Sequence, residues 1–299
     1  MRKSYVRPKM KNSPKILIVF FNTMWGAPLE YEGLPPGCQI TTDHRYLPEA
    51  DAVVFHIPDM GDIDKLPKSA GQIWVAWSME SEAHYPQLLD PGFMARFDLR
   101  MTYHLDADIV APYFMLMVDE LRTPPCPKSE LACYFSSSGN DHSGRTAYVR
   151  ELMRHMEVHS YGHTLRNRVL EEDKGTETKL KTIAGYKFTL AFENASTVDY
   201  VTEKLFEPLM AGSVPVYLGA PNVAEFAPGE HCFIDVNDFE GPEELAVYLK
   251  RLDNDEAAYR EYLTWKTRPL RRRFRELLET QRKHPFARLC EKIQEIRGK

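Results

Sequence analysis

Two charged residues open a predicted helix in the second half of the chain. Residues 199–219 read DYVTEKLFEPLMAGSVPVYLG, in which Thr202 suits an N-cap and Glu203 and Lys204 fall in the first turn. A lysine is unfavourable at the positive end of a helix unless an anion binds there. Helix N–H groups and an ammonium together form a natural phosphate or diphosphate site, and Glu203 could then accept from sugar hydroxyls. A solvated first turn without a ligand fits the spacing about equally well.

Short apolar runs before and after this segment predict buried parallel strands. They do not alternate polar and apolar positions, which is typical of strands covered on both faces. They are 16–21 (ILIVFF), 51–57 (DAVVFHI), 72–77 (QIWVAW), 186–194 (YKFTLAFEN) and 214–219 (VPVYLG). We interpret the pattern as strand–helix alternation that occurs twice, which predicts an α/β fold with ligands at the carboxyl ends of the strands.

A proline-rich segment divides the chain. LRTPPCPKSE at 121–130 contains three closely spaced prolines, which is typical of a linker between domains. We therefore predict two doubly wound domains that face a cleft, an N-terminal domain over 1–125 and a C-terminal domain over 126–268. Residues 269–299 predict a basic helix that packs back on the N-terminal domain or contacts an anionic membrane, and the first alternative is preferred.

The composition excludes several classes of protein. The formal net charge is −5, which gives no reason to expect a nucleic-acid partner. The five cysteines contain no CxxC pair, so neither a zinc site nor a dense disulfide framework is expected, although one or two disulfides stay possible. No apolar run approaches the roughly 18 residues of a membrane helix, and the basic first fifteen residues make a poor signal peptide. We expect no membrane anchor in this chain.

One long segment carries a family resemblance. Residues 186–228, YKFTLAFENASTVDYVTEKLFEPLMAGSVPVYLGAPNVAEFAP, closely resemble the donor-binding segment of the α1,3/α1,4-fucosyltransferases, glycosyltransferase family 10. The resemblance continues in HSYGHTLRNR at 159–168 and, more weakly, in WVAWSMESEAHYP from residue 74. It implies a GT-B fold, in which two Rossmann-like domains face a cleft, and an inverting transfer of L-fucose from GDP-β-L-fucose.

The resemblance also implies donor-binding residues in the C-terminal domain. Arg145 falls on an arginine of the family that binds the diphosphate. Arg145 and Lys204 would stabilise the charge that grows on the leaving GDP, which is the electrostatic part of catalysis. The remaining implied donor-binding residues are Asn194, Tyr200, Glu203, Tyr161 and Gly162.

A general base is expected in the N-terminal domain, because the acceptor hydroxyl must lose its proton. In WSMESEAHYP, Glu80 and Ser81 match the family's Glu and Ser, but Glu82 replaces its Pro, which leaves two candidate carboxylates. The position directly after an apolar strand favours Glu80 as the base. Glu82 and His84 are predicted to contact the acceptor.

The acceptor is predicted from weaker signals. GAPNVAEFAP and the YLTWK near Trp265 look most like the branch that fucosylates the innermost GlcNAc of the N-glycan core. Lewis-type transfer to the GlcNAc of lactosamine is the alternative, and a non-catalytic nucleotide- or glycan-binding homologue is the alternative of another class. That branch has a CxxC near its C terminus, where this chain has Ala287 and Cys290, so Cys290 is expected to have another partner or to be free.

We expect no cofactor bound by the protein and no metal site. GDP-fucose is the donor substrate, and stimulation by a divalent metal stays open. Asp106-Ala-Asp108 matches the DxD pattern of metal-dependent glycosyltransferases, but short acidic pairs are common by chance. The resemblance implies the Golgi lumen for a truncated eukaryotic protein and the cytoplasm for a bacterial one.

Overall fold

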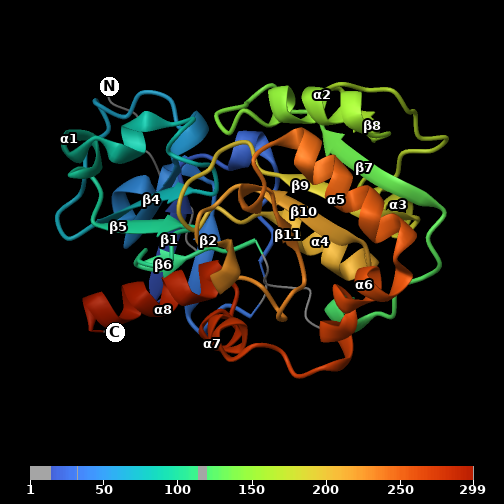
Figure 1. Cartoon of the computed structure of the whole chain (residues 1–299). Helices are drawn as coiled ribbons and strands as arrows, with labels where there is room; N and C mark the ends of the chain where they lie inside the picture. Colours follow the sequence, from blue (N-terminus) through green and yellow to red (C-terminus); the bar gives the residue numbers. More distant parts are fainter. Residues whose placement is uncertain (1–14, 32, 114–119, 299) are drawn as a thin grey trace, which may run out of the picture.

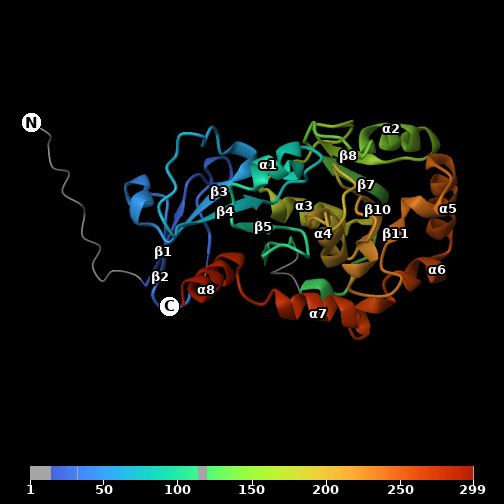
Figure 2. The same ribbon diagram turned by 90° about the vertical axis from the view of Figure 1, so that its left-hand side faces the viewer.

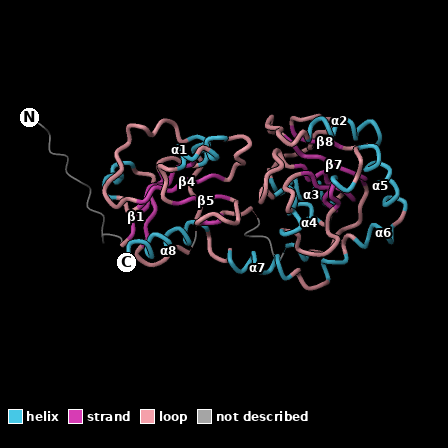
Figure 3. The backbone as a smooth tube through the Cα atoms, turned by 60° about the vertical axis from the view of Figure 1, so that its left-hand side comes forward, coloured by secondary structure: helices cyan, strands magenta, loops and turns pink. Residues whose placement is uncertain are grey.

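A computed structural model describes residues 15–31, 33–113 and 120–298, which form two α/β domains side by side (Figures 1 and 2). Almost all of the basic N-terminal segment discussed above lies outside the described residues. The two sheets lie in separate halves of the molecule, and loops from both halves approach each other between them (Figure 3).

Six described strands form the first sheet, in the order β2-β1-β3-β4-β5-β6, and all neighbours are parallel. The strands are β1 (Ile16–Phe20), β2 (Cys38–Thr41), β3 (Ala52–His56), β4 (Ile73–Ser78), β5 (Leu99–Thr102) and β6 (Ile109–Val110). Every residue of β1, β3 and β4 is buried, as their continuous apolar runs predict.

Five described strands form the second sheet, in the order β11-β10-β9-β7-β8, again all parallel. The strands are β7 (Glu130–Ser136), β8 (His159–Gly162), β9 (Tyr186–Phe192), β10 (Val214–Leu218) and β11 (Ile234–Asp235). In each sheet the strand order reverses once, between β1 and β3 in the first and between β7 and β9 in the second. Ligands of doubly wound sheets bind at the carboxyl ends of the strands at such switch points.

The second sheet is covered on both faces by helices from its own part of the chain. These are α2 (Arg145–His155), α3 (Thr176–Ala184), α4 (Glu203–Ala211), α5 (Pro242–Asn254) and α6 (Glu256–Glu261). One core joins the sheet to α2, α5 and α6, and another joins it to α4. Gly212 ends α4 with a φ of 74°, where a Cβ would lie 2.8 Å from Pro125 of the linker, so only glycine fits.

The first sheet is covered differently. Between its strands the described residues form only one short α-helix, α1 (Pro91–Met94), and short 3₁₀ turns, so the expected strand–helix alternation is wrong for this domain. The connecting segments are rich in Pro and Gly, which disfavour helices. One face is instead covered by the last helix, α8 (Pro285–Arg297), whose Phe286, Leu289 and Ile293 share a core with β1, β3 and β4 (Figure 2).

The basic tail forms two helices rather than one. α7 (Arg272–Thr280) buries Phe274 and Leu277 in the core of the second domain, and α8 then crosses to the first domain. Some arginines of the basic tail are paired with carboxylates. Arg273 lies 2.7 Å from Glu225, and Arg282 lies 2.6 Å from Glu279.

Cys290 of α8 lies next to a second thiol. Its side chain is within hydrogen-bond distance of Cys38 in β2, and Gln294 Nε2 donates to Cys38 Sγ at 3.3 Å. None of the five cysteines, all of which the structure describes, forms a disulfide.

Candidate functional site

Residues from both domains line one pocket, a cavity of about 340 Å³. The first domain contributes Trp25, Glu80, Tyr85 and Tyr113. The second domain contributes Ser138, Asn140, Asn194, Tyr200, Thr202, Glu203 and Lys204. The structure therefore brings together Glu80, Asn194, Tyr200, Glu203 and Lys204, which the sequence predicted as site residues, from positions far apart in the chain.

The start of α4 forms the second-domain wall of this pocket. Thr202 is the N-cap, and its hydroxyl accepts from the Lys204 N–H at 3.4 Å. Glu193 follows β9 directly and fixes this turn, because its carboxylate accepts from the Thr202 N–H and from the Thr202 hydroxyl, both at 2.8 Å. Glu193 is fully buried, and this burial raises its pKa.

Lys204 carries the positive charge of this wall. Its Nζ donates to Thr202 Oγ1 at 3.0 Å and to Glu203 Oε1 at 2.9 Å, and it lies 3.4 Å from Glu193 Oε2. Burial acts to lower the pKa of Lys204, but the carboxylates of Glu193 and Glu203 outweigh it and raise the pKa above its ordinary value. Lys204 is therefore an ammonium that two carboxylates hold in one place.

Glu80 stands on the opposite wall, just after β4. Ser78 Oγ accepts from the Glu80 N–H at 3.1 Å and donates to the Glu80 carbonyl at 2.9 Å, which forms a tight turn. Across the domain boundary, Tyr200 Oη donates to Glu80 Oε2 at 3.4 Å. Burial and the nearby Glu80 carboxylate raise the pKa of Tyr200, so its phenol stays protonated and able to donate.

Arg145 lies behind the second-domain wall rather than on its surface. The side chain is only 2% exposed, and it donates to Phe192 O at 3.1 Å, Ser138 O at 3.4 Å and Asn140 O at 3.1 Å. Its buried Nε has no hydrogen-bond partner. Because Ser138 and Asn140 line the pocket, Arg145 holds the loop after β7 against the end of β9 and places a positive charge behind it.

Tyr161 and Gly162 end β8 at the same edge of the sheet but do not line this pocket. The Tyr161 hydroxyl lies 2.8 Å from that of Tyr186, and Tyr161 lines a separate cavity of about 430 Å³ beside α3. Gly162 has a φ of 79°, and a Cβ there would lie 2.5 Å from Ser136 O. Its lack of a side chain lets the ends of β7 and β8 approach each other.

Glu82 and His84 lie at the contact between the domains and do not line the pocket. The Glu82 carboxylate accepts from Tyr103 Oη and lies 3.2 Å from His104 Nε2. The His84 ring packs against His142 of the second domain, with ring centres 4.8 Å apart. Both side chains therefore contact protein groups, and their contact with the acceptor stays a prediction.

Several residues at the pocket or directly behind it were missed by sequence reasoning. Glu193 carried the same signal as Glu80, a carboxylate directly after an apolar strand, and could have been found. Trp25 lies in an irregular segment after β1, where no periodicity marks it, and Tyr113 is equally unmarked. Trp25 is 55% exposed and has φ 46° and ψ 39°, a left-handed conformation that is rare for a bulky residue.

The acidic pair Asp106-Ala-Asp108 has structural partners. Asp108 accepts from the Arg100 N–H at 2.8 Å, and Asp106 lies 3.4 Å from the Arg100 guanidinium. Within the described ranges 15–31, 33–113 and 120–298, no group of three or more His, Cys, Asp or Glu side chains could hold a metal ion.

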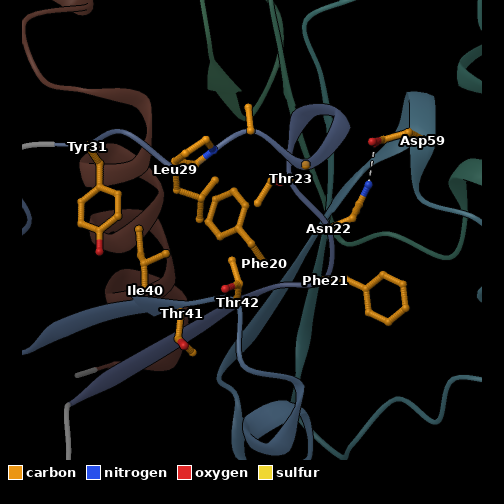
Figure 4. A pocket seen from close by; sticks show the side chains of 13 residues that line it. Phe20, Phe21, Asn22, Thr23, Leu29, Tyr31, Ile40, Thr41, Thr42 and Asp59 are labelled. Atoms are coloured by element: carbon orange, nitrogen blue, oxygen red, sulfur yellow. Dashed lines mark hydrogen bonds between the residues drawn. The ribbon is translucent and has the colours of Figure 1, made fainter.

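A larger cavity of about 630 Å³ lies in the first domain, at the carboxyl ends of β1 and β2 (Figure 4). Its lining combines aromatic rings with polar side chains, including Phe21, Tyr31, Thr41, Thr42 and Asp59. Asn22 Nδ2 donates to Asp59 Oδ1 at 2.7 Å, and Asp59 Oδ2 accepts from the Trp25 N–H at 2.8 Å. Trp25, which lines the pocket that holds Glu80, is therefore hydrogen-bonded to a residue that lines this cavity.

Comparison with known sequences decides the family. Residues 125–299 match "Glycosyltransferase family 10 (fucosyltransferase) C-term", and residues 12–114 match "Fucosyltransferase, N-terminal". The chain belongs to glycosyltransferase family 10. This family 10 chain is 37% identical over 241 residues to 4-galactosyl-N-acetylglucosaminide 3-alpha-L-fucosyltransferase 9 of Rattus norvegicus, and the match covers 77% of this chain and 64% of the rat protein. It is 36% identical over 290 residues to 4-galactosyl-N-acetylglucosaminide 3-alpha-L-fucosyltransferase FUT6 of Gorilla gorilla gorilla, and this match covers 92% of this chain and 77% of the gorilla protein.

Solved structures support the fold of this family 10 chain. One described as "Crystal Structure of alpha1,3-Fucosyltransferase" matches with a TM-score of 0.61 and 19% identity, over 89% of this chain and 84% of that chain. The two parallel-sheet domains and this likeness confirm the predicted GT-B fold. Of the helices in the described part of the chain, none is long and apolar enough to cross a membrane.

Proposed function

We propose that this chain transfers L-fucose, with inversion, from GDP-β-L-fucose in α1,3 linkage to a GlcNAc of a glycan. The observation that carries this proposal is the pocket between the domains. There, a carboxylate that can act as a base, Glu80, is opposite an ammonium at a helix start, Lys204. Family membership and the names of the relatives support the same reaction.

The reaction needs a base on one side of the sugar and a charge clamp on the other. The acceptor hydroxyl oxygen forms a bond to C1 of fucose while the bond between C1 and the β-phosphate oxygen breaks. Glu80 takes the hydroxyl proton, and the electron pair of the broken bond leaves with GDP. Attack from the face opposite GDP converts a β-linked donor into an α-linked product. Inversion therefore needs the base and the charge clamp on opposite sides of the sugar, which fits Glu80 and Lys204 on opposite walls of the pocket.

The second-domain wall would bind the donor. Lys204 and the N–H groups at the start of α4 stabilise the charge on the departing diphosphate, and Arg145 adds positive charge behind the wall. Tyr200 donates to Glu80 and fixes the direction of the base. The other donor-binding residues in this proposal are Asn194 and Glu203 in the pocket, with Tyr161 and Gly162 at the end of β8.

The first-domain wall would bind the acceptor. Trp25 exposes a large ring at the pocket, and its N–H donates to Asp59 of the polar cavity. Aromatic faces next to hydroxyl and carboxylate groups suit sugar rings. The relatives are named for 4-galactosyl-N-acetylglucosaminide acceptors, so we favour a galactosylated GlcNAc. The innermost GlcNAc of an N-glycan core, which the sequence favoured, is the competing acceptor.

A transfer assay with mass-spectrometric detection tests the proposal. Purified protein receives GDP-fucose with a lactosamine oligosaccharide or with an N-glycan core glycopeptide, and GDP binding is measured by calorimetry in parallel. Glu80→Gln removes the base with little change of shape. Glu279→Gln is the matched control, because Glu279 is an exposed carboxylate on α7 that pairs with Arg282.

The proposal predicts fucose on lactosamine, about a hundredfold less transfer in Glu80→Gln, and unchanged GDP binding in both variants. Transfer to the core glycopeptide alone would keep the reaction and replace the acceptor. Full activity in Glu80→Gln would exclude Glu80 as the base. GDP binding without transfer to either acceptor would favour a non-catalytic nucleotide-binding homologue.

A further inference from the structure

A group of hydrogen-bonded side chains joins the two domains next to the pocket. His104, which follows β5, lies between two carboxylates, with Nε2 3.2 Å from Glu82 Oε2 and Nδ1 3.5 Å from Asp199 Oδ2. Glu82 and His104 belong to the first domain, and Asp199 belongs to the loop that leads into α4. The Leu105 N–H also donates to Asp199 Oδ2, at 2.9 Å.

Further contacts fix the same loop. Thr197 Oγ1 lies 3.1 Å from Ser81 Oγ and 3.3 Å from Tyr103 Oη, and Tyr103 Oη donates to Glu82. Within the second domain, Asp199 and Asn222 exchange two hydrogen bonds, of 2.9 and 2.8 Å. These contacts hold Asp199 at a φ of 67°, a conformation that most residues avoid.

The loop matters because it ends at the pocket. Tyr200 follows Asp199 and donates to Glu80, and Thr202 caps the helix that carries Lys204. Glu82 occupies the position where the family pattern described above has a proline. In this chain the extra carboxylate is used to bind His104, since it is 16% exposed and faces the imidazole and the Tyr103 hydroxyl.

The charges of the group support one another near neutral pH. Burial acts to lower the pKa of His104, but Asp199 and Glu82 outweigh it and raise the pKa to about 9. Burial acts to raise the pKa of Glu82 and of Asp199, but hydrogen bonds outweigh it and lower both values. In the described part of the chain, Glu82, Asp199 and Tyr103 are the titratable groups that these contacts place against His104.

We propose that Glu82, His104 and Asp199 form a latch between the domains that positions the 195–202 loop, and with it Tyr200 and Lys204, opposite Glu80. The three are positioning residues, and their effect on transfer rests on the proposed function. The imidazolium contributes fully below about pH 6.5, the ordinary value for histidine, and its contribution is lost as the pH rises through about 9. The Glu82 and Asp199 carboxylates stop stabilising the latch only when the pH falls into the acid range, because their pKa values are lowered.

Variants that remove one charge, and one variant that keeps it, test the latch. Glu82→Gln and His104→Gln remove one charge each, whereas His104→Arg keeps a positive charge at every accessible pH. Glu151→Gln is the matched control, because Glu151 is an exposed carboxylate that also pairs with a histidine, His155, at 3.3 Å. The measurements are the NMR titration of His104, amide hydrogen exchange of residues 195–202, and kcat and KM from pH 6 to 10.

The latch predicts a lower His104 pKa in Glu82→Gln and faster exchange of the 195–202 amides. It predicts a roughly tenfold lower kcat at pH 7.5 in Glu82→Gln and His104→Gln, and none of these changes in Glu151→Gln. Wild-type kcat should fall above pH 9, whereas His104→Arg should keep its activity there.

Two results would overturn the latch. One is unchanged exchange of residues 195–202 in both Glu82→Gln and His104→Gln. The other is an alkaline loss of kcat in His104→Arg equal to that of the wild type. The titration and the exchange measurements need no turnover, so they test the latch even if the wild-type protein transfers no fucose and the proposed function fails.

Discussion

The two walls of the pocket are built in different ways. Most of the second-domain wall comes from one stretch of sequence, residues 194–204, and the buried Glu193 behind it holds Thr202 and Lys204 in place. The first-domain wall consists of Trp25, Glu80, Tyr85 and Tyr113, which come from three separate segments. The two domains show the same difference between local and distant segments. The core of the second domain contains helices from its own part of the chain, whereas the core of the first contains α8 from the end of the chain.

This difference suits two kinds of ligand. A diphosphate presents the same charge in every donor molecule, so a rigid wall of paired charges can bind each of them in the same way. Acceptor sugars differ in ring substituents and linkage, and loops that carry aromatic rings can vary without disturbing a core. We therefore expect substitutions in the second-domain wall to abolish transfer and substitutions in the first-domain wall to change acceptor preference.

The largest effect is expected for Lys204→Met. Loss of the ammonium removes the stabilisation of the leaving diphosphate and leaves Glu193 buried without its positive partner. Removal of one such electrostatic contact typically costs about a hundred- to a thousandfold in rate. We expect that loss in kcat, together with weaker GDP binding by calorimetry.

Lys187→Met is the control for this prediction. Lys187 also pairs with two carboxylates, Asp253 at 2.9 Å and Glu256 at 3.7 Å, but it lies near the start of β9, away from the pocket. It should keep both GDP binding and transfer. Equal losses in Lys187→Met and Lys204→Met would show that any disturbed lysine pair impairs the fold, and that the second-domain wall has no special role.

The difference between local and distant segments also explains which site residues could be predicted from the sequence. Asn194, Tyr200, Glu203 and Lys204 lie in one continuous motif, so local reasoning placed them together and the structure shows them in one pocket. The strands β1, β3, β4, β9 and β10 were equally visible, because each is a largely buried apolar run.

Non-local features could not be predicted in this way. The strands β2, β5 and β6 are short or mixed in polarity, and they are recognisable only beside their neighbours in the sheet. Nothing in the sequence shows that His104 will lie beside Glu82. The position of Trp25 depends on the hydrogen bond from its N–H to Asp59, which follows a different strand.

A second prediction concerns α8, the C-terminal helix that covers the first domain. Under oxidising conditions, with oxidised glutathione as the electron acceptor, Cys38 and Cys290 should form a disulfide that ties β2 to α8. Such a bond closes a very long loop and should stabilise the first domain by about 2 to 4 kcal/mol. Peptide mapping should find the loss of two hydrogens at this pair, and thermal unfolding with and without reductant should show the stabilisation.

Cys133 and Cys232 provide the internal control for this prediction. Both are buried in the second domain and should stay reduced under the same conditions. Cys38→Ser should abolish the effect of the oxidant on stability. If oxidation stabilises Cys38→Ser as much as the wild type, the contact between α8 and β2 is not the source.

The smallest effect is expected for Trp25→Ala, and it separates the two walls most sharply. A stacking contact between an exposed indole and a sugar is worth about 1 kcal/mol, or roughly a fivefold change in binding. We expect that increase in KM for the oligosaccharide acceptor, with the KM for GDP-fucose unchanged. Leu89→Ala, which removes another exposed apolar side chain of the first domain, should change neither value. A matching increase in the donor KM of Trp25→Ala would show that both walls bind one ligand, because Trp25 would then contact the nucleotide sugar as well.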